Sequence, residues 1–517
     1  MFFSSTSQEN IAQKCQRWFW WFLIIHNILW VIMPTWLRYA LPHDTIEGAL
    51  WGQHLELGYD KNPWMNAWLT RLGWALGGTS GVGIYALSSV FVAISFWAVW
   101  RLANKFLHPL YALIAVFLLE GCINYTLVPQ AFNDNLIELG LWPLMFLCFY
   151  QAIKQQKTRY WLATGIVAGL AMMAKYYTAI PLVIMFIFLV CKSEGRRNFA
   201  KSGIYLSLIS FILVCLPHMI WLFQHNFITI AYAANRTENI GLSSWKLHLL
   251  YPIDFALAQI INFIFPLFLL CLLYSRKKLN QTYLAKPDLL PTFPRQFLLT
   301  MAFGPYLLTL LLAIIFGWRL FNEWGVPLAS LWGLILIAFS QPAITLTAFK
   351  RFFIIIYIVM FLWAAIYAIG LTFDKRHRHS DNYPAQEIAD YVTQQWWNQY
   401  HKPLKYVAGS RYIAGYIAFY SADHPSVYVE WNDQFSPWLD IKDMKKYGAV
   451  FVQDNYYGTL VFGNKKPETD GGNHFPSEIL HQFPNLKIIP VKYFDWHRTN
   501  TTLKPIPVLI GILPPEK

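Results

Sequence analysis

Two carboxylates near the start of the chain stand at a spacing that suits acid–base chemistry. Asp44 and Glu47 lie in the segment 41–75, and a helix beginning there would place both side chains on one face. A carboxylate in such a place could take a proton from a bound hydroxyl group. The alternative is structural: an acidic first turn followed by tryptophan anchors (Trp64, Trp68 and Trp74) at a membrane interface explains the same residues.

Basic side chains occur in the segments that would share a surface with this pair. Cations that hold a phosphate, beside a carboxylate that acts as base, would suit a reaction on a membrane-bound phosphate substrate. Lys175 has no acidic residue near it in the sequence. Instead of binding a phosphate, its side chain could extend toward the lipid headgroups. His218 is more typical of a core histidine than of a catalyst. Further charged candidates are Asp134, Arg236, Arg319 and Glu323.

Membrane-spanning segments must position these residues. The chain is 56% hydrophobic and only 13% charged, which excludes disorder and argues against a soluble enzyme. Eleven apolar runs approach the roughly 20 residues that cross a bilayer. The first could imitate a signal peptide, but it is long, bulky and lacks a small-residue cleavage site, so we interpret it as a span. The runs are 18–40, 81–100, 108–128, 136–153, 160–174, 178–191, 203–223, 247–274, 297–316, 325–340 and 351–371.

The net charge of +13 predicts the orientation of these spans. Residues 1–371 carry +12 and residues 372–517 carry +1. With the N-terminus inside, the cytoplasmic segments collect 18 basic and three acidic residues, which is the positive-inside pattern. The basic excess therefore belongs to the membrane part, and a nucleic-acid partner is excluded. Residues 372–517 would then face the periplasm or the exterior.

Residues 372–517 have the pattern of an α/β domain that follows the transmembrane domain at 1–371. Strands are predicted at 404–409, 426–430, 448–453 and 505–513, with helices near 384–399, 411–421 and 475–483. All six cysteines precede residue 372, so this domain has no disulfide, and no Cys/His spacing indicates a metal site. Residues 275–296 are predicted to be a long cytoplasmic loop.

Four motifs follow one another along the chain. They are Asp44-x-x-Glu47-x-x-x-Trp51-Gly52-Gln53 with Gly58-Tyr59-x-Lys61-x-Pro63; Tyr160-Trp161-Leu162 with Gly169-Leu170-Ala171-Met172-Met173-Ala174-Lys175-Tyr176; Leu216-Pro217-His218 with Tyr232 and Arg236; and Ala408-Gly409-x-Arg411 with Ala418-Phe419-Tyr420-Ser421. These motifs resemble those of the bacterial GT-C glycosyltransferases, the superfamily of the protein O-mannosyltransferases and the lipid A aminoarabinose transferase. Many members have Pro-Pro where this chain has Asn62-Pro63-Trp64, a departure that could alter acceptor choice.

The resemblance implies a polytopic α-helical membrane protein of the GT-C fold, with about 11 transmembrane helices and a periplasmic C-terminal α/β domain, in a bacterial inner membrane. It implies an inverting transfer of a sugar from a polyprenyl-phosphate donor to an acceptor hydroxyl on the periplasmic face. By resemblance, Asp44 is the general base and Glu47 orients the substrate. The implied contacts to the donor phosphate are Lys61 and Lys175, with Arg236 or Arg319; we assign Tyr59, Asp134, Tyr176 and His218 to substrate binding.

Several properties stay open in the sequence. The sugar is unspecified, and the acceptor could be lipid A, another glycolipid or a protein hydroxyl. A metal-independent mechanism is favoured, although Asp44, Glu47 and Asp134 could bind a divalent cation. A transporter or lipid flippase would use charges within the spans and often shows inverted repeats, whereas here the charges gather at the outer rim and no repeat is found. A non-catalytic scaffold that binds envelope components is the third alternative.

Overall fold

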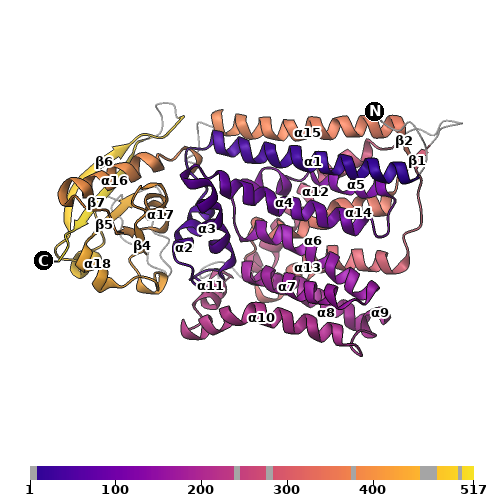
Figure 1. The fold of residues 1–517 in the computed structure, drawn as a ribbon, viewed down its shortest axis with the longest axis horizontal. Helices are drawn as coiled ribbons and strands as arrows, with labels where there is room; N and C mark the ends of the chain where they lie inside the picture. The colour runs from indigo at the N-terminus through magenta and orange to yellow at the C-terminus, as the bar shows by residue number, and fades with distance from the viewer. Residues whose placement is uncertain are drawn as a thin grey trace.

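The structure is a computed structural model that describes residues 8–237, 245–274, 283–373, 380–454, 474–498 and 504–516. A bundle of long helices makes up most of it, and a unit built around a β-sheet lies at one end of the bundle (Figure 1). The first and last long helices of the bundle, α1 (Gln8–Leu37) and α15 (Leu346–Phe373), lie side by side, with the ring centroids of Trp18 and Phe349 5.3 Å apart.

Each of the eleven predicted apolar runs contains a helix. In the described residues, eight helices are long and apolar enough to cross a bilayer, or nine if one bent pair counts as a single span. The chain is thus a multi-pass membrane protein. The helices that lie in the eleven apolar runs are α1, α15, α4 (Val82–Ala103), α5 (Pro109–Leu119), α6 (Asp134–Gln155), α7 (Thr158–Ala174), α8 (Ala179–Cys191), α10 (Ser202–Gln224), α12 (Tyr251–Cys271), α13 (Thr292–Phe316) and α14 (Trp332–Ser340).

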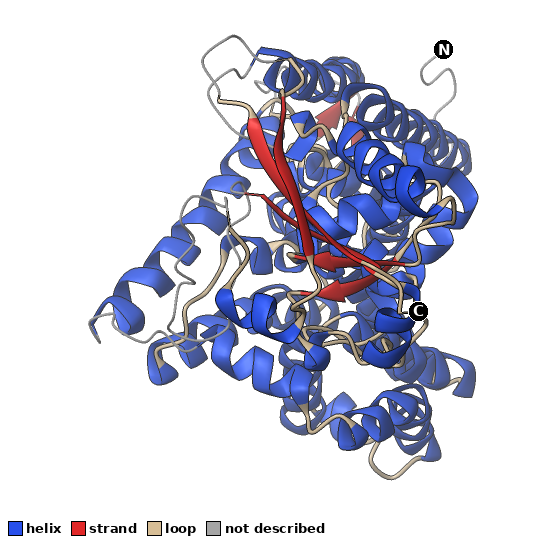
Figure 2. Ribbon diagram, turned by 90° about the vertical axis from the view of Figure 1, so that its left-hand side faces the viewer, coloured by secondary structure: helices blue, strands red, loops and turns tan. Residues whose placement is uncertain are grey.

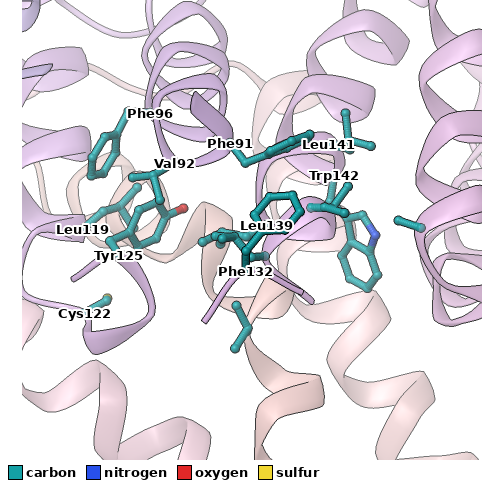
Figure 3. Close-up of a cluster of buried hydrophobic side chains, with 14 of the residues drawn as sticks. Phe91, Val92, Phe96, Leu119, Cys122, Tyr125, Phe132, Leu139, Leu141 and Trp142 are labelled. Carbon is teal, nitrogen blue, oxygen red and sulfur yellow. The ribbon is translucent and has the colours of Figure 1, made fainter. Parts of the chain in front are cut away.

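The third run is bent, whereas the sequence predicted one span over 108–128. Helix α5 ends at Leu119, and the short turns of 123–130 continue at 90° to it. Gly121 lies at the bend, where a Cβ would come within 2.9 Å of Leu269. Phe96 and Tyr125 belong to the cluster of buried side chains beside the bend (Figure 3). The ring of Tyr125 stacks on Phe96, with the ring centroids 4.8 Å apart, and its hydroxyl pairs with that of Ser95 at 2.8 Å. The bend precedes the start of α6, where Asp134 lies.

Charged groups also lie inside the bundle, which the sequence did not predict. His26 of α1 and Glu120, just after α5, form a pair with a nitrogen–oxygen distance of 2.9 Å, and both side chains are buried. Glu138 of α6 is buried as well and accepts a hydrogen bond of 2.8 Å from the Thr178 hydroxyl. The expectation that the charges gather at the outer rim therefore does not hold for these residues, and one carboxylate oxygen of each acid has a polar partner within the bundle.

The segment 41–75 forms two helices between the bundle and the sheet unit, as the acidic start and the tryptophan spacing predicted (Figure 1). They are α2 (His43–Gly52) and α3 (Met65–Gly77), and the connection between them contains a β-bridge from Gly58 to Pro63. Helix α3 packs closely on α4, because a Cβ at Gly83 would lie 2.1 Å from the carbonyl oxygen of Gly73.

The C-terminal unit is the predicted α/β fold (Figure 2). Its sheet has the order β4-β3-β5-β7-β6, in which β3 pairs in parallel with β4 and β5, and β7 pairs antiparallel with β5 and β6. The elements are α16 (Ala385–Tyr400), β3 (Tyr406–Gly409), α17 (Arg411–Tyr420), β4 (Ser426–Val429), α18 (Ile441–Tyr447), β5 (Ala449–Asp454), α19 (Ser477–Gln482), β6 (Lys487–Phe494) and β7 (Ile506–Leu513).

The four predicted strands and three predicted helices of this unit are present, but β6 and α18 were missed. β6 is an edge strand with two lysines, a proline and mostly exposed side chains, so its sequence lacks a clear apolar period. The predicted loop at 275–296 is only partly irregular, because it contains β1 (Tyr283–Ala285), which pairs with β2 (Ile344–Thr345), and the beginning of α13. Residues 275–282 lie outside the described residues.

The bundle and the C-terminal unit share one hydrophobic core. Helix α17 of the C-terminal unit packs on α2, and a Cβ at Gly415 would lie 2.8 Å from a methyl carbon of Ile46. Tyr416 of α17 donates a hydrogen bond of 2.9 Å to the carbonyl oxygen of Leu41. The segment that carries Asp44 and Glu47 is therefore held from both sides.

Candidate functional site

Asp44 lies in the first turn of α2, and its side chain is exposed to solvent. The side-chain amide of Asn133 donates a hydrogen bond of 3.0 Å to Oδ2 of Asp44. Asn133 is itself fixed, because its Oδ1 caps α6 by accepting from the backbone N–H of Leu136. Desolvation by the surrounding protein raises the pKa of the Asp44 carboxyl, and the negative charge of Glu47 raises it further. A carboxylate with a raised pKa is better suited to accept a proton.

Glu47 follows one turn later on α2 and is buried between two cations. Its Oε1 lies 2.5 Å from Nζ of Lys61 and 2.6 Å from Nη1 of Arg411. Burial alone would raise the pKa of Glu47, but the charges of Lys61 and Arg411 more than offset this and hold the pKa below its usual value. The two carboxylates of the predicted pair therefore differ: the pKa of Glu47 is lowered, whereas the pKa of Asp44 is raised.

Lys175 follows the last residue of α7 and has two polar partners. Its Nζ lies 2.8 Å from Oδ2 of Asp134 and donates a hydrogen bond of 2.6 Å to Oδ1 of Asn135. Although no acidic residue is near Lys175 in the sequence, α6 brings its acidic first turn to it from 40 residues away. The predicted site residue Asp134 is thus a partner of a predicted phosphate contact.

A cavity of about 410 Å³ collects three of the four predicted phosphate contacts. Lys61, Lys175 and Arg236 all line it, and Arg236 comes from α11 (Ile228–Thr237). Apolar and aromatic side chains complete the lining, among them Ile180, Tyr232, Leu312, Leu320 and Trp324. Cations together with apolar sides suit a phosphate joined to a hydrocarbon chain.

Arg319 is outside the lining of this cavity but stands close to it. Its guanidinium lies 5.1 Å from the ring centroid of Phe321, and the guanidinium of Arg236 lies 4.3 Å from the same ring. The two arginines therefore converge on one aromatic side chain near the cavity. Glu323, the acidic candidate of the same segment, is exposed.

The other three predicted substrate contacts, which are Tyr59, Tyr176 and His218, lie in different surroundings. Tyr176 lines the cavity, and its hydroxyl lies 2.5 Å from Nε2 of His218. His218 is buried, and its Nδ1 lies 2.7 Å from the carbonyl oxygen of Leu57. Because a carbonyl only accepts, Nδ1 carries the proton, and Nε2 accepts from Tyr176. This is the core-histidine alternative. Tyr59 is also fully buried, and its hydroxyl donates to the carbonyl oxygen of His54 at 2.6 Å.

Two residues of the site were not predicted. Arg411 stood in the sequence only as part of a motif of the C-terminal unit, and the structure brings it to Glu47. Asn133 had no assigned role, and it holds Asp44. The only sequence signal for Asn133 is its place as an N-cap before the apolar run of α6. In the described part of the chain, no three His, Cys, Asp or Glu side chains are grouped so that they could hold a metal ion.

Comparison with known proteins relates this geometry to a superfamily. Residues 61–221 match the family model described as dolichyl-phosphate-mannose-protein mannosyltransferase. The structure of ArnT from Cupriavidus metallidurans bound to undecaprenyl phosphate superposes with a TM-score of 0.57, covering 97% of this chain and 99% of ArnT at 12% identity. The chain has the GT-C fold. The same protein in its apo state gives the same TM-score and coverage.

The predicted GT-C fold with a C-terminal α/β unit is thereby confirmed, whereas the predicted span count and orientation stay predictions. The family match supports the predicted resemblance over residues 61–221. In sequence, the chain is also similar to the lipopolysaccharide core galacturonosyltransferase RgtA of Rhizobium johnstonii, with 24% identity over 212 residues. That match covers 39% of this chain and 41% of RgtA. The matched residues include Lys61, Lys175 and His218, whereas Asp44, Glu47 and Arg236 lie outside them.

Proposed function

We propose that this GT-C-fold protein is a membrane glycosyltransferase that moves a sugar from a polyprenyl-phosphate donor to an acceptor hydroxyl on the periplasmic face of the inner membrane. The observation that carries the proposal is the cavity lined by Lys61, Lys175 and Arg236, next to the helix that carries Asp44. The cations suit the phosphate, the apolar lining suits the first isoprene units, and Asp44 supplies a base at the same end of the bundle.

In the proposed reaction, Asp44 accepts the proton of the acceptor hydroxyl, and the hydroxyl oxygen forms a bond to the anomeric carbon. The bond from that carbon to the phosphate oxygen breaks, its electron pair leaves with polyprenyl phosphate, and the configuration is inverted. Lys61, Lys175 and Arg236 stabilise the negative charge that develops on the phosphate. Asn133 keeps Oδ2 of Asp44 occupied, so that Oδ1 is the oxygen available for the proton.

The relatives support the choice of donor and acceptor class. The ArnT structure contains undecaprenyl phosphate, which supports a polyprenyl phosphate as the leaving lipid. RgtA is named for transfer to a lipopolysaccharide core, which supports lipid A or another glycolipid, rather than a protein, as the acceptor. The positive-inside distribution of charge supports a site on the periplasmic face. There, nucleotide sugars are absent and a lipid-linked donor must be used.

Mass spectrometry of envelope lipids from cells with and without the protein tests this function. Cells with the unmodified chain should contain a lipid heavier by one sugar, and the Asp44→Asn variant, in which the base is lost, should not. Asp390→Asn is the matched control, because Asp390 is an exposed acid on α16 of the C-terminal unit. Sugar transfer by Asp44→Asn would overturn the assignment of the base. Lipid transport without any sugar transfer would favour the flippase alternative.

A further inference from the structure

Arg411 links the C-terminal unit to the segment that carries Asp44. It is the first residue of α17, separated from the end of β3 by Ser410 alone, and its side chain is only 1% exposed. Its guanidinium lies 2.6 Å from Glu47 and 2.9 Å from Asp60, and its Nε lies 3.8 Å from Glu430. Glu47 and Asp60 belong to the bundle side, and Glu430 follows β4 of the C-terminal unit. One buried cation therefore joins acids of both parts of the chain.

The contacts of Arg411 continue to the donor cavity. Oε1 of Glu47 lies within hydrogen-bond distance of both Nη1 of Arg411 and Nζ of Lys61. Lys61 in turn lines the cavity in which the donor phosphate is placed. Two consecutive ion pairs thus connect the C-terminal unit to a phosphate-binding lysine.

The charges of this cluster show what Arg411 contributes. If Arg411 were uncharged or absent, Lys61 alone would face the three carboxylates of Glu47, Asp60 and Glu430. A lysine surrounded by acids is drawn toward them, and its positive charge is neutralised before it can act on a phosphate. Arg411 supplies donors to all three acids, with the fork of its guanidinium on Glu47 and Asp60. Lys61 then shares a single carboxylate oxygen, and its ammonium keeps its place at the cavity.

We propose that Arg411 is a positioning residue of the donor site: by holding Glu47 it fixes Lys61 and leaves its charge available for the phosphate, so that the donor site is complete only when the C-terminal α/β unit is seated on α2. This inference rests on the proposed function, because it assigns the donor phosphate to the cavity at Lys61. It gives the C-terminal unit a role in donor binding.

The test is binding of undecaprenyl phosphate to the purified full-length chain in nanodiscs, compared among matched arginine variants. Arg411→Gln should weaken binding by about ten- to a hundredfold, the range found when groups that orient a binding residue are removed. Arg498→Gln is the matched control. Arg498 also connects the C-terminal unit to the bundle, through a hydrogen bond of 2.7 Å to the carbonyl oxygen of Leu37, but it contacts none of the three acids. Its binding should stay within about threefold of the unmodified chain.

A double-mutant cycle separates positioning through Glu47 from a general loss of structure. If Arg411 acts through Glu47, the loss of affinity caused by Arg411→Gln should be smaller in a Glu47→Gln background than in the unmodified chain. If Arg411 only stabilised the fold, Arg411→Gln would lower the unfolding temperature and leave the affinity of the folded protein unchanged. If Arg411→Gln does not fold, Arg411→Lys keeps the charge without the guanidinium fork, and it should fold with reduced affinity.

The role of Arg411 alone would be overturned if Arg411→Gln bound undecaprenyl phosphate as tightly as the unmodified chain does. Where only Arg411→Lys folds, equal affinity of that variant would have the same consequence. An equal loss in both backgrounds would overturn the route through Glu47. If the unmodified chain does not bind undecaprenyl phosphate, the proposed donor is wrong, and the inference falls with it.

Discussion

Asp44 and Lys175 are held by consecutive residues at the start of α6: Asn133 donates to Asp44 at 3.0 Å, and Asp134 pairs with Lys175 at 2.8 Å. The proposed base and a proposed phosphate contact are therefore placed by one helical turn. Because a helix start is rigid when it is capped and buried, the two groups keep a fixed relation to one another.

The pH dependence of sugar transfer should report the environment of Asp44. A base must be unprotonated, so transfer should fall as the pH decreases through the raised pKa of Asp44, which lies above the ordinary value of 3.8. The hydrogen bond from Asn133 favours the ionised carboxyl and opposes this shift. In Asn133→Ala, the acidic limb of kcat should therefore move to higher pH. An acidic limb at the same pH in both proteins would contradict the role of Asn133.

Loss of the Lys175 charge should slow transfer strongly. The ammonium would stabilise charge that develops on the leaving phosphate, so Lys175→Met should lower kcat by about a hundredfold or more, as does removal of one preorganised donor elsewhere. The measurement is single-turnover transfer with a polyprenyl-phosphate sugar. Lys442→Met, an exposed lysine on α18, is the matched control and should be as active as the unmodified chain. Full activity of Lys175→Met would exclude this lysine from the donor site.

The ion pairs of Glu47 should make stability depend on pH in one direction. The pKa of Glu47 is below its ordinary value of 4.5 in the folded chain, so its contribution to stability is fully present above that value. The contribution is lost as the pH falls from 4.5 through the folded-state pKa. Thermal unfolding should show Glu47→Gln to be less stable than the unmodified chain at neutral pH, with the difference shrinking below pH 4.5. A difference that grows toward acidic pH would show the opposite sign of linkage.

Removal of divalent cations should leave transfer intact. Two of the three carboxylates that could bind a cation are already engaged: Glu47 by Lys61 and Arg411, and Asp134 by Lys175. A metal ion would have to displace these partners. We expect the rate in a chelator to equal the rate in added magnesium or manganese. A rate that collapses in the chelator and returns with one metal would show that the cation is required.

The close approach of α3 and α4 should tolerate no side chain at Gly83. A Cβ there would lie 2.1 Å from the backbone oxygen of Gly73, and a backbone atom cannot move away cheaply. Gly83→Ala should therefore destabilise the protein by about 1–3 kcal/mol, the usual cost of overpacking. Gly370→Ala is the control, because a Cβ at Gly370 meets no atom within 4 Å. Unfolding temperatures in detergent compare the two, and equal values would contradict the packing argument.

The apolar runs of the sequence determined where the helices of the bundle lie, and shorter apolar runs determined four of the five strands of the C-terminal sheet. Burial in a bilayer or a sheet imposes these periods locally, so they can be read without the fold. Residues 108–128 form a bent pair, and Gly121 at the bend packs against Leu269, which is distant in the sequence. Strand β6 was missed because an edge strand needs only one paired side, and its exposed side chains show no apolar period.

For the site, the sequence determined the residue types: a carboxylate pair one helical turn apart, and lysines and arginines in the loops at one end of the spans. Only the tertiary structure decided the partners. Glu47 and Arg411 lie 364 residues apart in the chain, and Asp44 and Asn133 lie 89 apart. No local period encodes such pairs, because they form where packed helices bring charged groups out of water and each group must find a partner. That requirement, and not the residue types, separated the two carboxylates into one that stays ionised and one that can take a proton.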